Sequence, residues 1–225
     1  MKNRLRFVVN HDYGDKTIDY VMDIMDQLME DEPEVFTKEY FREMRLTADH
    51  CGFYPRPEQL PRMQDLGMII SCAGRISPMS SMLRSGVMGV AEGEFGAEGG
   101  ERETALAQFY PRISRKTTDG ITVASGEAIN RNQVIKAATT WPSFYILKED
   151  DLGSLETGKL ADFIVMNKDY FSVPEAEIPS VYPLMTVVGG KTVVLREEFG
   201  SEIGMTAVGP QMIFHSELDW RRGGE

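Results

Sequence analysis

The stretch Met68-Ile69-Ile70-Ser71-Cys72 is an almost continuous apolar run, without the polar and apolar alternation of a half-exposed strand. Continuous apolar strands are typical of parallel sheets, because helices cover both faces of such a sheet. Gly67 ends a helical pattern just before this run, and residues 80–85 form a second helical pattern beyond it. The stretch therefore predicts a buried strand between two helices.

The same unit of strand and helix extends in both directions along the chain. The further members are strands at residues 6–10, 45–50 and 86–91 and helices at residues 15–31 and 57–66. Four strand patterns thus alternate with three helical patterns. This alternation predicts a parallel sheet, either doubly wound or closed into a (β/α)8 barrel.

The pattern changes after residue 150. Before that point, residues 92–103 are a loop rich in Gly and Glu, and helical patterns follow at residues 104–114 and 128–140, with Pro142 ending or kinking the second. After it come short strand patterns. They lie at residues 160–166, 184–188 and 191–195, the last two joined by Gly189-Gly190. We expect a small antiparallel β unit here.

Composition excludes some classes of function. The 225 residues include 24 basic and 35 acidic side chains, a net charge of −11, which repels phosphate backbones and anionic lipids. We therefore expect neither a nucleic-acid partner nor a membrane partner. Two cysteines are too few for a disulfide framework, and no stretch has the roughly 18 apolar residues of a membrane helix. We expect a cytoplasmic protein.

One motif is more specific than these patterns. The segment Gly153-Ser154-Leu155-Glu156-Thr157-Gly158-Lys159-Leu160-Ala161-Asp162, followed by Phe163-Ile164-Val165-Met166, resembles the metal-dependent amidohydrolase superfamily, whose members return from barrel to β-sandwich through such a segment. Thr186-Val187-Val188-Gly189-Gly190-Lys191 resembles that family's final hairpin. The most similar branch holds the N-substituted formamide deformylases and the exoenzyme-regulator-like proteins.

Two histidine motifs extend the resemblance backward. His11-Asp12-Tyr13-Gly14-Asp15 resembles the family's His-x-x-Gly-Asp after the fifth barrel strand, and Asp49-His50 resembles its Glu-His after the sixth. The resemblance implies an α/β fold in which residues 1–150 are the C-terminal half of a (β/α)8 barrel. Residues 151–196 would be a segment of the small β-sandwich domain, and residues 197–225 a C-terminal arm or tail.

The chain also departs from the family pattern. The family's first strand ends in His-x-His, whereas none of the three histidines here has that spacing. The resemblance therefore implies that another chain supplies these ligands. At the eighth strand the family has Gly-Ser-Asp; here Glu94 supplies the carboxylate if the loop shifts by one residue, while direct alignment places Phe95 there.

The resemblance implies a function in outline. His11 and His50 would bind a divalent metal, with zinc favoured, and Glu94 would carry a proton during hydrolysis of an amide-type C–N bond in a small molecule. The residues alone also allow a pair of hydrogen-bonded histidines at strand ends and a solvated acidic loop. The alternative function is a non-catalytic amidohydrolase-like binding or regulatory protein.

A half barrel also predicts association. Its two edge strands would lack partners, and the apolar side chains of a barrel interior would be exposed. We expect the partner to be a chain that carries the N-terminal half of the barrel, or further copies of this chain.

Overall fold

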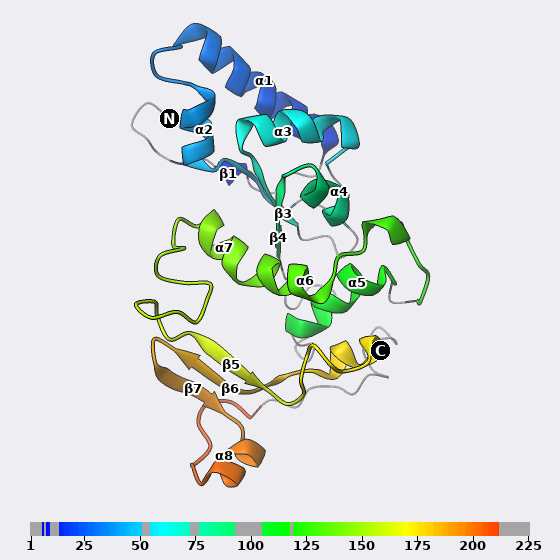
Figure 1. The fold of residues 1–225 in the computed structure, drawn as a ribbon, viewed down its shortest axis with the longest axis vertical. Helices are drawn as coiled ribbons and strands as arrows, with labels where there is room; N and C mark the ends of the chain where they lie inside the picture. Colours follow the sequence, from blue (N-terminus) through cyan, green and yellow to red (C-terminus); the bar gives the residue numbers. More distant parts are fainter. Residues whose placement is uncertain are drawn as a thin grey trace.

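The computed structural model describes residues 6, 8–9, 14–50, 55–72, 77–92, 105–117 and 119–211. Within these ranges four strands form a parallel sheet in the order β1-β2-β3-β4 (Figure 1). The strands are β1 (Val8–Val9), β2 (Thr47–Ala48), β3 (Ile69–Cys72) and β4 (Met88–Ala91). All three neighbouring pairs are parallel, so the predicted parallel sheet is confirmed. Strand order equals chain order, as it does in a (β/α) barrel.

Helices follow each of the first three strands. They are α1 (Asp15–Asp31), α2 (Lys38–Met44), α3 (Leu60–Leu66) with the short turn η1 (Pro57–Gln59) before it, and α4 (Met79–Arg84). The sequence pattern did not predict α2. This helix has seven residues and buries only Phe41, so it has no apolar period to detect.

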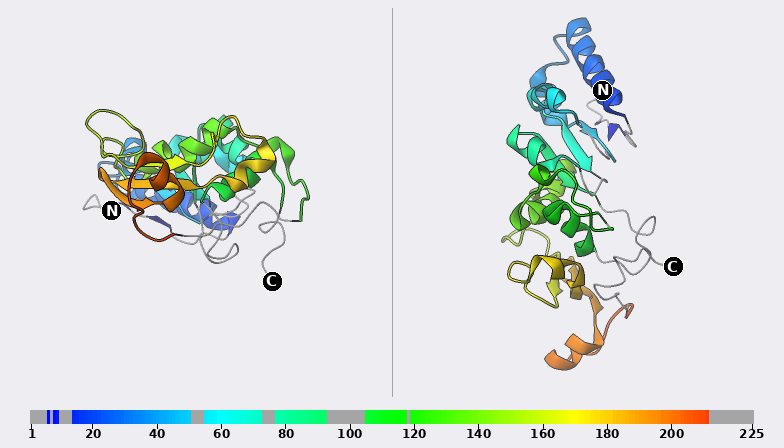
Figure 2. Two further views of the ribbon diagram at one scale, coloured as in Figure 1. Left: turned by 90° about the horizontal axis from the view of Figure 1, so that it is seen from below. Right: turned by 90° about the vertical axis from the view of Figure 1, so that its right-hand side faces the viewer.

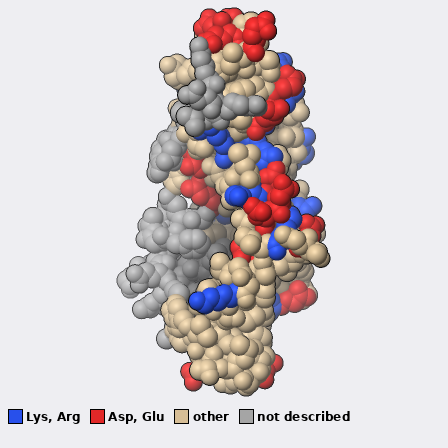
Figure 3. Space-filling view, turned by 90° about the vertical axis from the view of Figure 1, so that its left-hand side faces the viewer, with Lys and Arg blue, Asp and Glu red and all other residues tan. Residues whose placement is uncertain are grey.

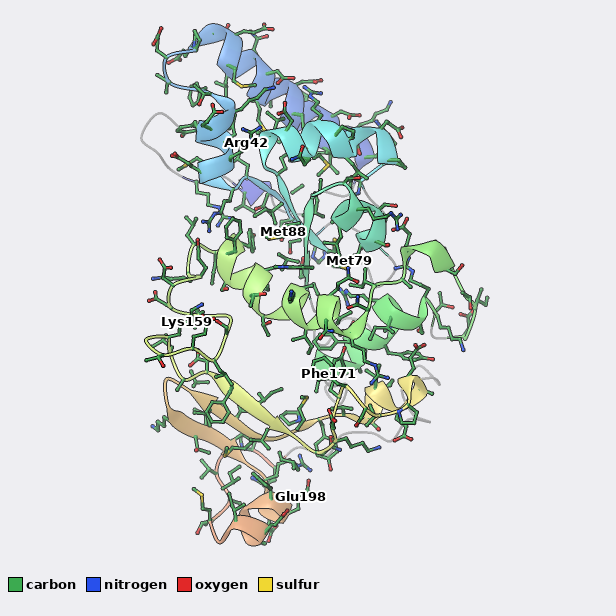
Figure 4. All side chains as sticks on the ribbon, in the orientation of Figure 1. Arg42, Met79, Met88, Lys159, Phe171 and Glu198 are labelled. Atoms are coloured by element: carbon green, nitrogen blue, oxygen red, sulfur yellow. The ribbon has the colours of Figure 1, made fainter. Side chains whose placement is uncertain are left out.

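Both faces of the parallel sheet are buried. Ile70 and Cys72 on one face belong to the main core with α1, α3 and α4. Gly89 permits close packing of β4 against α4, since a Cβ at this position would lie 2.8 Å from Met82 Cε. Figure 4 shows the two elements, with Met79 of α4 and Met88 of β4 labelled. On the opposite face, Ile69 and Val90 are 3% and 5% exposed. The expectation of an exposed apolar interior face is therefore wrong for these two residues.

A helical layer lies between the two sheets (Figures 1 and 2). It contains η2 (Ala105–Gln108), α5 (Phe109–Ser114), η3 (Ser125–Glu127), α6 (Arg131–Ala138) and α7 (Thr140–Tyr145). The predicted helix at residues 128–140 corresponds to α6, and α7 is a second helix that begins after Thr139, whose φ and ψ are −132° and −83°. Pro142 lies in the first turn of α7, where an N–H has no intrahelical acceptor.

The C-terminal part forms a separate antiparallel sheet in the order β5-β6-β7. Its elements are β5 (Phe163–Met166), η4 (Glu175–Ser180), β6 (Pro183–Val188), β7 (Lys191–Leu195) and α8 (Glu197–Ile203). The predicted hairpin is confirmed, and Gly189 and Gly190 form its turn with φ of 56° and 75°. Within the expected arm, residues 197–203 are helical rather than extended, and residues 212–225 lie outside the described residues.

The described surface mixes both signs of charge. Figure 3 shows acidic side chains covering one end of the molecule, where α1 ends, and basic and acidic side chains interspersed along the flank. None of the helices within the described ranges has the length and apolar character needed to cross a bilayer.

Candidate functional site

The carboxyl ends of three neighbouring strands bring together His50, Ser71 and Glu92. His50 follows β2 by two residues, Ser71 lies within β3, and Glu92 directly follows β4. The carboxyl ends of parallel strands share one edge of the sheet, which is where barrel enzymes place their chemistry. The structure therefore places one predicted ligand, His50, at the expected edge.

His50 is buried and turned by an unusual backbone conformation. Its side chain is 8% exposed, and its φ of 65° lies in the left-handed region, which is uncommon for residues other than glycine. Regular alternation would place residue 50 on the same face as Ala48, which packs in the helix-covered core. Because the left-handed angle interrupts the alternation, the imidazole instead reaches Glu92, with 2.7 Å between Nδ1 and Oε1.

Glu92 lies at the centre of this group. Its Oε1 contacts His50 Nδ1, and its Oε2 accepts a hydrogen bond from Ser71 Oγ at 3.1 Å. Its backbone N–H donates to the carbonyl of Cys72 at 3.0 Å, so the residue still belongs to the ladder between β3 and β4. Both carboxylate oxygens and the backbone N–H of Glu92 are therefore held by hydrogen-bonding partners.

Arg112 of α5 links the carboxyl end of β3 to the residue that follows β4. The residue is 1% exposed, and its Nη2 donates to the carbonyls of Cys72 at 3.0 Å and of Glu92 at 2.9 Å. Its Nη1 donates to the carbonyl of Gln108 at 2.6 Å. A buried guanidinium is tolerated only with such hydrogen bonds, so Arg112 fixes the spacing of the two strand ends.

Cys72 is not a nucleophile in this arrangement. Burial raises the pKa of its thiol to about 11, an effect that the nearby Arg112 guanidinium only partly offsets. The thiol is therefore protonated at neutral pH, whereas nucleophiles and metal ligands require the thiolate. Cys72 packs in the core with the helices.

The other predicted site residues, His11 and Glu94, lie outside the described residues. Within the described part of the chain, no group of three or more His, Cys, Asp or Glu side chains could hold a metal ion. For Glu92 the sequence favoured a solvated loop over a metal-facing cluster of the loop's glutamates. Its position directly after a buried strand is the sequence signal that distinguishes it from the later glutamates of that loop.

The described donors fit part of a metal site. A ligating histidine in a protein almost always has its second ring nitrogen bonded to a carboxylate, carbonyl or water, and His50 has Glu92 in that place. Zinc sites need at least three protein ligands. His50 therefore fits one metal ligand, with Glu92 bonded to its second ring nitrogen. The other ligands of a zinc site must come from outside the described residues.

Comparisons with known proteins identify the family. The model of the Amidohydrolase family matches residues 6–194. A 5-methylthioadenosine/S-adenosylhomocysteine deaminase of Thermodesulfovibrio yellowstonii is 29% identical over 135 residues, which cover 56% of this chain and 30% of the deaminase.

Two solved structures share the fold. An amidohydrolase from Thermotoga maritima has a TM-score of 0.53 at 14% identity, over 86% of this chain and 44% of its own. An adenosine deaminase from Xanthomonas campestris with bound zinc also has a TM-score of 0.53, at 12% identity, over 96% of this chain and 56% of its own. The chain thus spans about half the length of these structures and less than a third of the curated deaminase. Because the family model matches most of its length, the chain belongs to the Amidohydrolase family.

Proposed function

We propose that this chain provides the C-terminal half of the (β/α)8 barrel of a metal-dependent hydrolase that cleaves an amide-type C–N bond in a small molecule. The observation that carries the proposal is the contact between His50 and Glu92 at the carboxyl edge of the parallel sheet. The relatives support the reaction class, because two of them are named as deaminases. The branch of the N-substituted formamide deformylases is the proposed place within the family.

His50 and His11 are the proposed ligands of a divalent metal, zinc by preference, as in the deaminase with bound zinc. When bound, such a metal lowers the pKa of its water to about 7 and so supplies hydroxide at neutral pH. Glu94 is the proposed proton carrier between water and the leaving nitrogen. Its place in the sequence, three residues after β4, supports this role.

The remaining strands of the barrel, with the His-x-His ligands, are proposed to come from another segment, whether on a second chain or on a longer polypeptide. The share of the solved relatives that this chain covers, 44% and 56%, supports this proposal. Residues 151–196 are proposed to be part of the β-sandwich domain, and the antiparallel sheet of β5, β6 and β7 is consistent with that assignment.

The test is metal content and hydrolysis in material isolated with its native partners. We expect zinc in the wild type, and loss of both zinc and amide hydrolysis in His11→Ala and His50→Ala. His215→Ala is the matched control, since His215 belongs to no motif. Equal zinc content in all four proteins would contradict the proposal.

A non-catalytic binding or regulatory protein is the second candidate. The absence of the family's Gly-Ser-Asp from residues 90–96 favours it. The same assay separates the two candidates, because this second protein would hydrolyse no amide either in the wild type or in His50→Ala.

A further inference from the structure

Three side chains from three neighbouring strands form a hydrogen-bonded series. Ser71 Oγ donates to Glu92 Oε2 at 3.1 Å, and Glu92 Oε1 lies 2.7 Å from His50 Nδ1. Ser71 is 4% exposed and His50 is 7% exposed, so water competes little for either contact. A carboxylate accepts hydrogen bonds and donates none, which requires that the proton of this contact reside on Nδ1.

We propose that Glu92 is a positioning residue that holds the neutral imidazole of His50 in its Nδ1–H tautomer and fixes the plane of its ring. In this tautomer Nε2 carries the lone pair, which is the form in which that nitrogen ligates a metal. The use of this orientation for metal binding rests on the proposed function. The Nδ1–H tautomer of His50 does not depend on the metal site.

The surroundings of Glu92 suit a fixed residue rather than a moving one. Each carboxylate oxygen is engaged by a buried side chain, and the backbone is held by the Cys72 carbonyl at its N–H and by Arg112 at its carbonyl. A swing toward a substrate would break both side-chain contacts. Ser71 completes the arrangement by donating to the second carboxylate oxygen.

The tautomer can be measured in the full chain when this chain alone is labelled and is assembled with its native partners. The chain has only three histidines, so histidine labelled with ¹⁵N gives a spectrum of three rings, and His50→Gln identifies the ring of His50. Spectra are recorded without metal, at a pH where the imidazole is neutral. We expect His50 to show the Nδ1–H tautomer in the wild type and to keep it in Glu92→Gln, whose carbonyl oxygen still accepts.

Removal of the acceptor should change the tautomer. In Glu92→Ala we expect His50 to shift toward Nε2–H, the tautomer that free histidine prefers. Glu127→Ala is the matched control, because Glu127 is similarly shielded and accepts from Ser81 N at 2.8 Å, yet its described contacts include no histidine. An Nε2–H tautomer in the wild type, or an unchanged Nδ1–H tautomer in a folded Glu92→Ala, would overturn the inference. The wild-type spectrum alone decides it if Glu92→Ala does not fold.

A second measurement separates this inference from the proposed function. Loss of a group that orients a metal ligand typically weakens metal affinity about 10-fold to 100-fold. We expect this loss of zinc affinity, measured by competition with a chelator in the complex with native partners, for Glu92→Ala but not for Glu127→Ala. A wild type that binds no zinc would contradict the proposed function, while the tautomer would still decide the role of Glu92.

Discussion

At the scale of the residue, the Arg45 side chain shows how a single ion pair anchors a distant loop. Arg45 precedes β2, and its guanidinium binds the Glu149 carboxylate, with 2.9 Å between Nη1 and Oε2. The same group lies over the Phe144 ring, 3.5 Å from its centroid, and donates to the Phe144 carbonyl. The loop after α7 is therefore tied to the start of the parallel sheet.

This pair should contribute to the pH dependence of stability. Hydrogen bonding to Arg45 lowers the pKa of Glu149 from 4.5 to about 2. A carboxyl whose pKa is lowered by folding stabilises the protein above its unfolded pKa and loses that contribution as the pH falls from about 4.5 to about 2. Glu149 is 36% exposed, so solvent screening reduces the contribution to about 1 kcal/mol.

Urea denaturation at pH 7 and pH 3 checks this prediction. Glu149→Gln should lose about 1 kcal/mol at pH 7 and less at pH 3. Glu34→Gln, at an exposed turn, is the control and should lose little at either pH. An equal loss at both pH values in Glu149→Gln would show that the charge does not matter.

Residues also show where sequence reasoning succeeds and where it fails at the site. The position of His50 at the strand edge was predicted, because a histidine at the end of a strand pattern is visible in the sequence. The contact between Glu92 and the His50 ring was not predicted, because it depends on the left-handed φ of His50, which turns the ring across the strand ends. Sequence periodicity assumes regular alternation, so a single residue that breaks it hides the contact.

At the scale of the element, the most specific motif acts as a connector. Gly153 packs against α7, Lys159 Nζ donates to Ser154 Oγ at 2.9 Å (Figure 4), and Asp162 Oδ1 accepts from the N–H of Gly189 at 2.5 Å. The N–H of Gly190 donates to the carbonyl of Ala161 at 3.0 Å. The motif therefore fastens the turn of the β6–β7 hairpin to the segment that leaves α7.

Gly153 should be the most sensitive glycine of this motif. A Cβ there would lie 2.2 Å from Ser143 Oγ and 3.0 Å from Thr140 Cα, at a φ of 93°. Gly158 has a similar φ of 99° but open space around it. Gly153→Ala should therefore destabilise the protein by about 1–3 kcal/mol more than Gly158→Ala, because only the former overpacks a core contact.

Thermal or urea unfolding of both variants measures this difference. Since both substitutions strain a left-handed backbone, the difference between them reports the packing against α7 alone. Equal destabilisation would show that α7 moves away without cost.

Elements with a long apolar period were predicted well. The period of α1 gave both of its ends, Asp15 and Asp31, and the hairpin followed from Gly189-Gly190 between two apolar runs. The break at Thr139 was misplaced, because Pro142 fits the first turn of a new helix as readily as it ends an old one. The seven-residue helix α2 was missed because it buries only Phe41 and so shows no apolar period.

At the scale of the whole molecule, the edges of the parallel sheet are the feature on which association is expected to depend. β1 and β4 have described partners on one side only, β2 and β3 respectively. The inner-face residues Ile69 and Val90 are already buried. Association is therefore expected through unpaired strand edges rather than through a broad apolar surface.

We expect that the chain expressed alone does not form a stable monomer, and that a co-expressed chain with a His-x-His strand restores a defined assembly. Light scattering coupled to size exclusion measures the mass, and thermal melting reports cooperativity. A monodisperse monomer that melts cooperatively would contradict the half-barrel proposal. Self-assembly without the second chain would instead favour copies of this chain as the partner.

The sequential order of β1, β2, β3 and β4 has a consequence for how genes can encode such a sheet. In this order, strands that are consecutive in the chain are also neighbours in the sheet, and no other described strand lies between them. A stop codon and a new start codon placed between any two units would therefore divide the sheet between two polypeptides without threading one through the other. Fusion of two adjacent reading frames would join the halves as simply. A sheet with this strand order can be encoded by one gene or by two without a change in its topology.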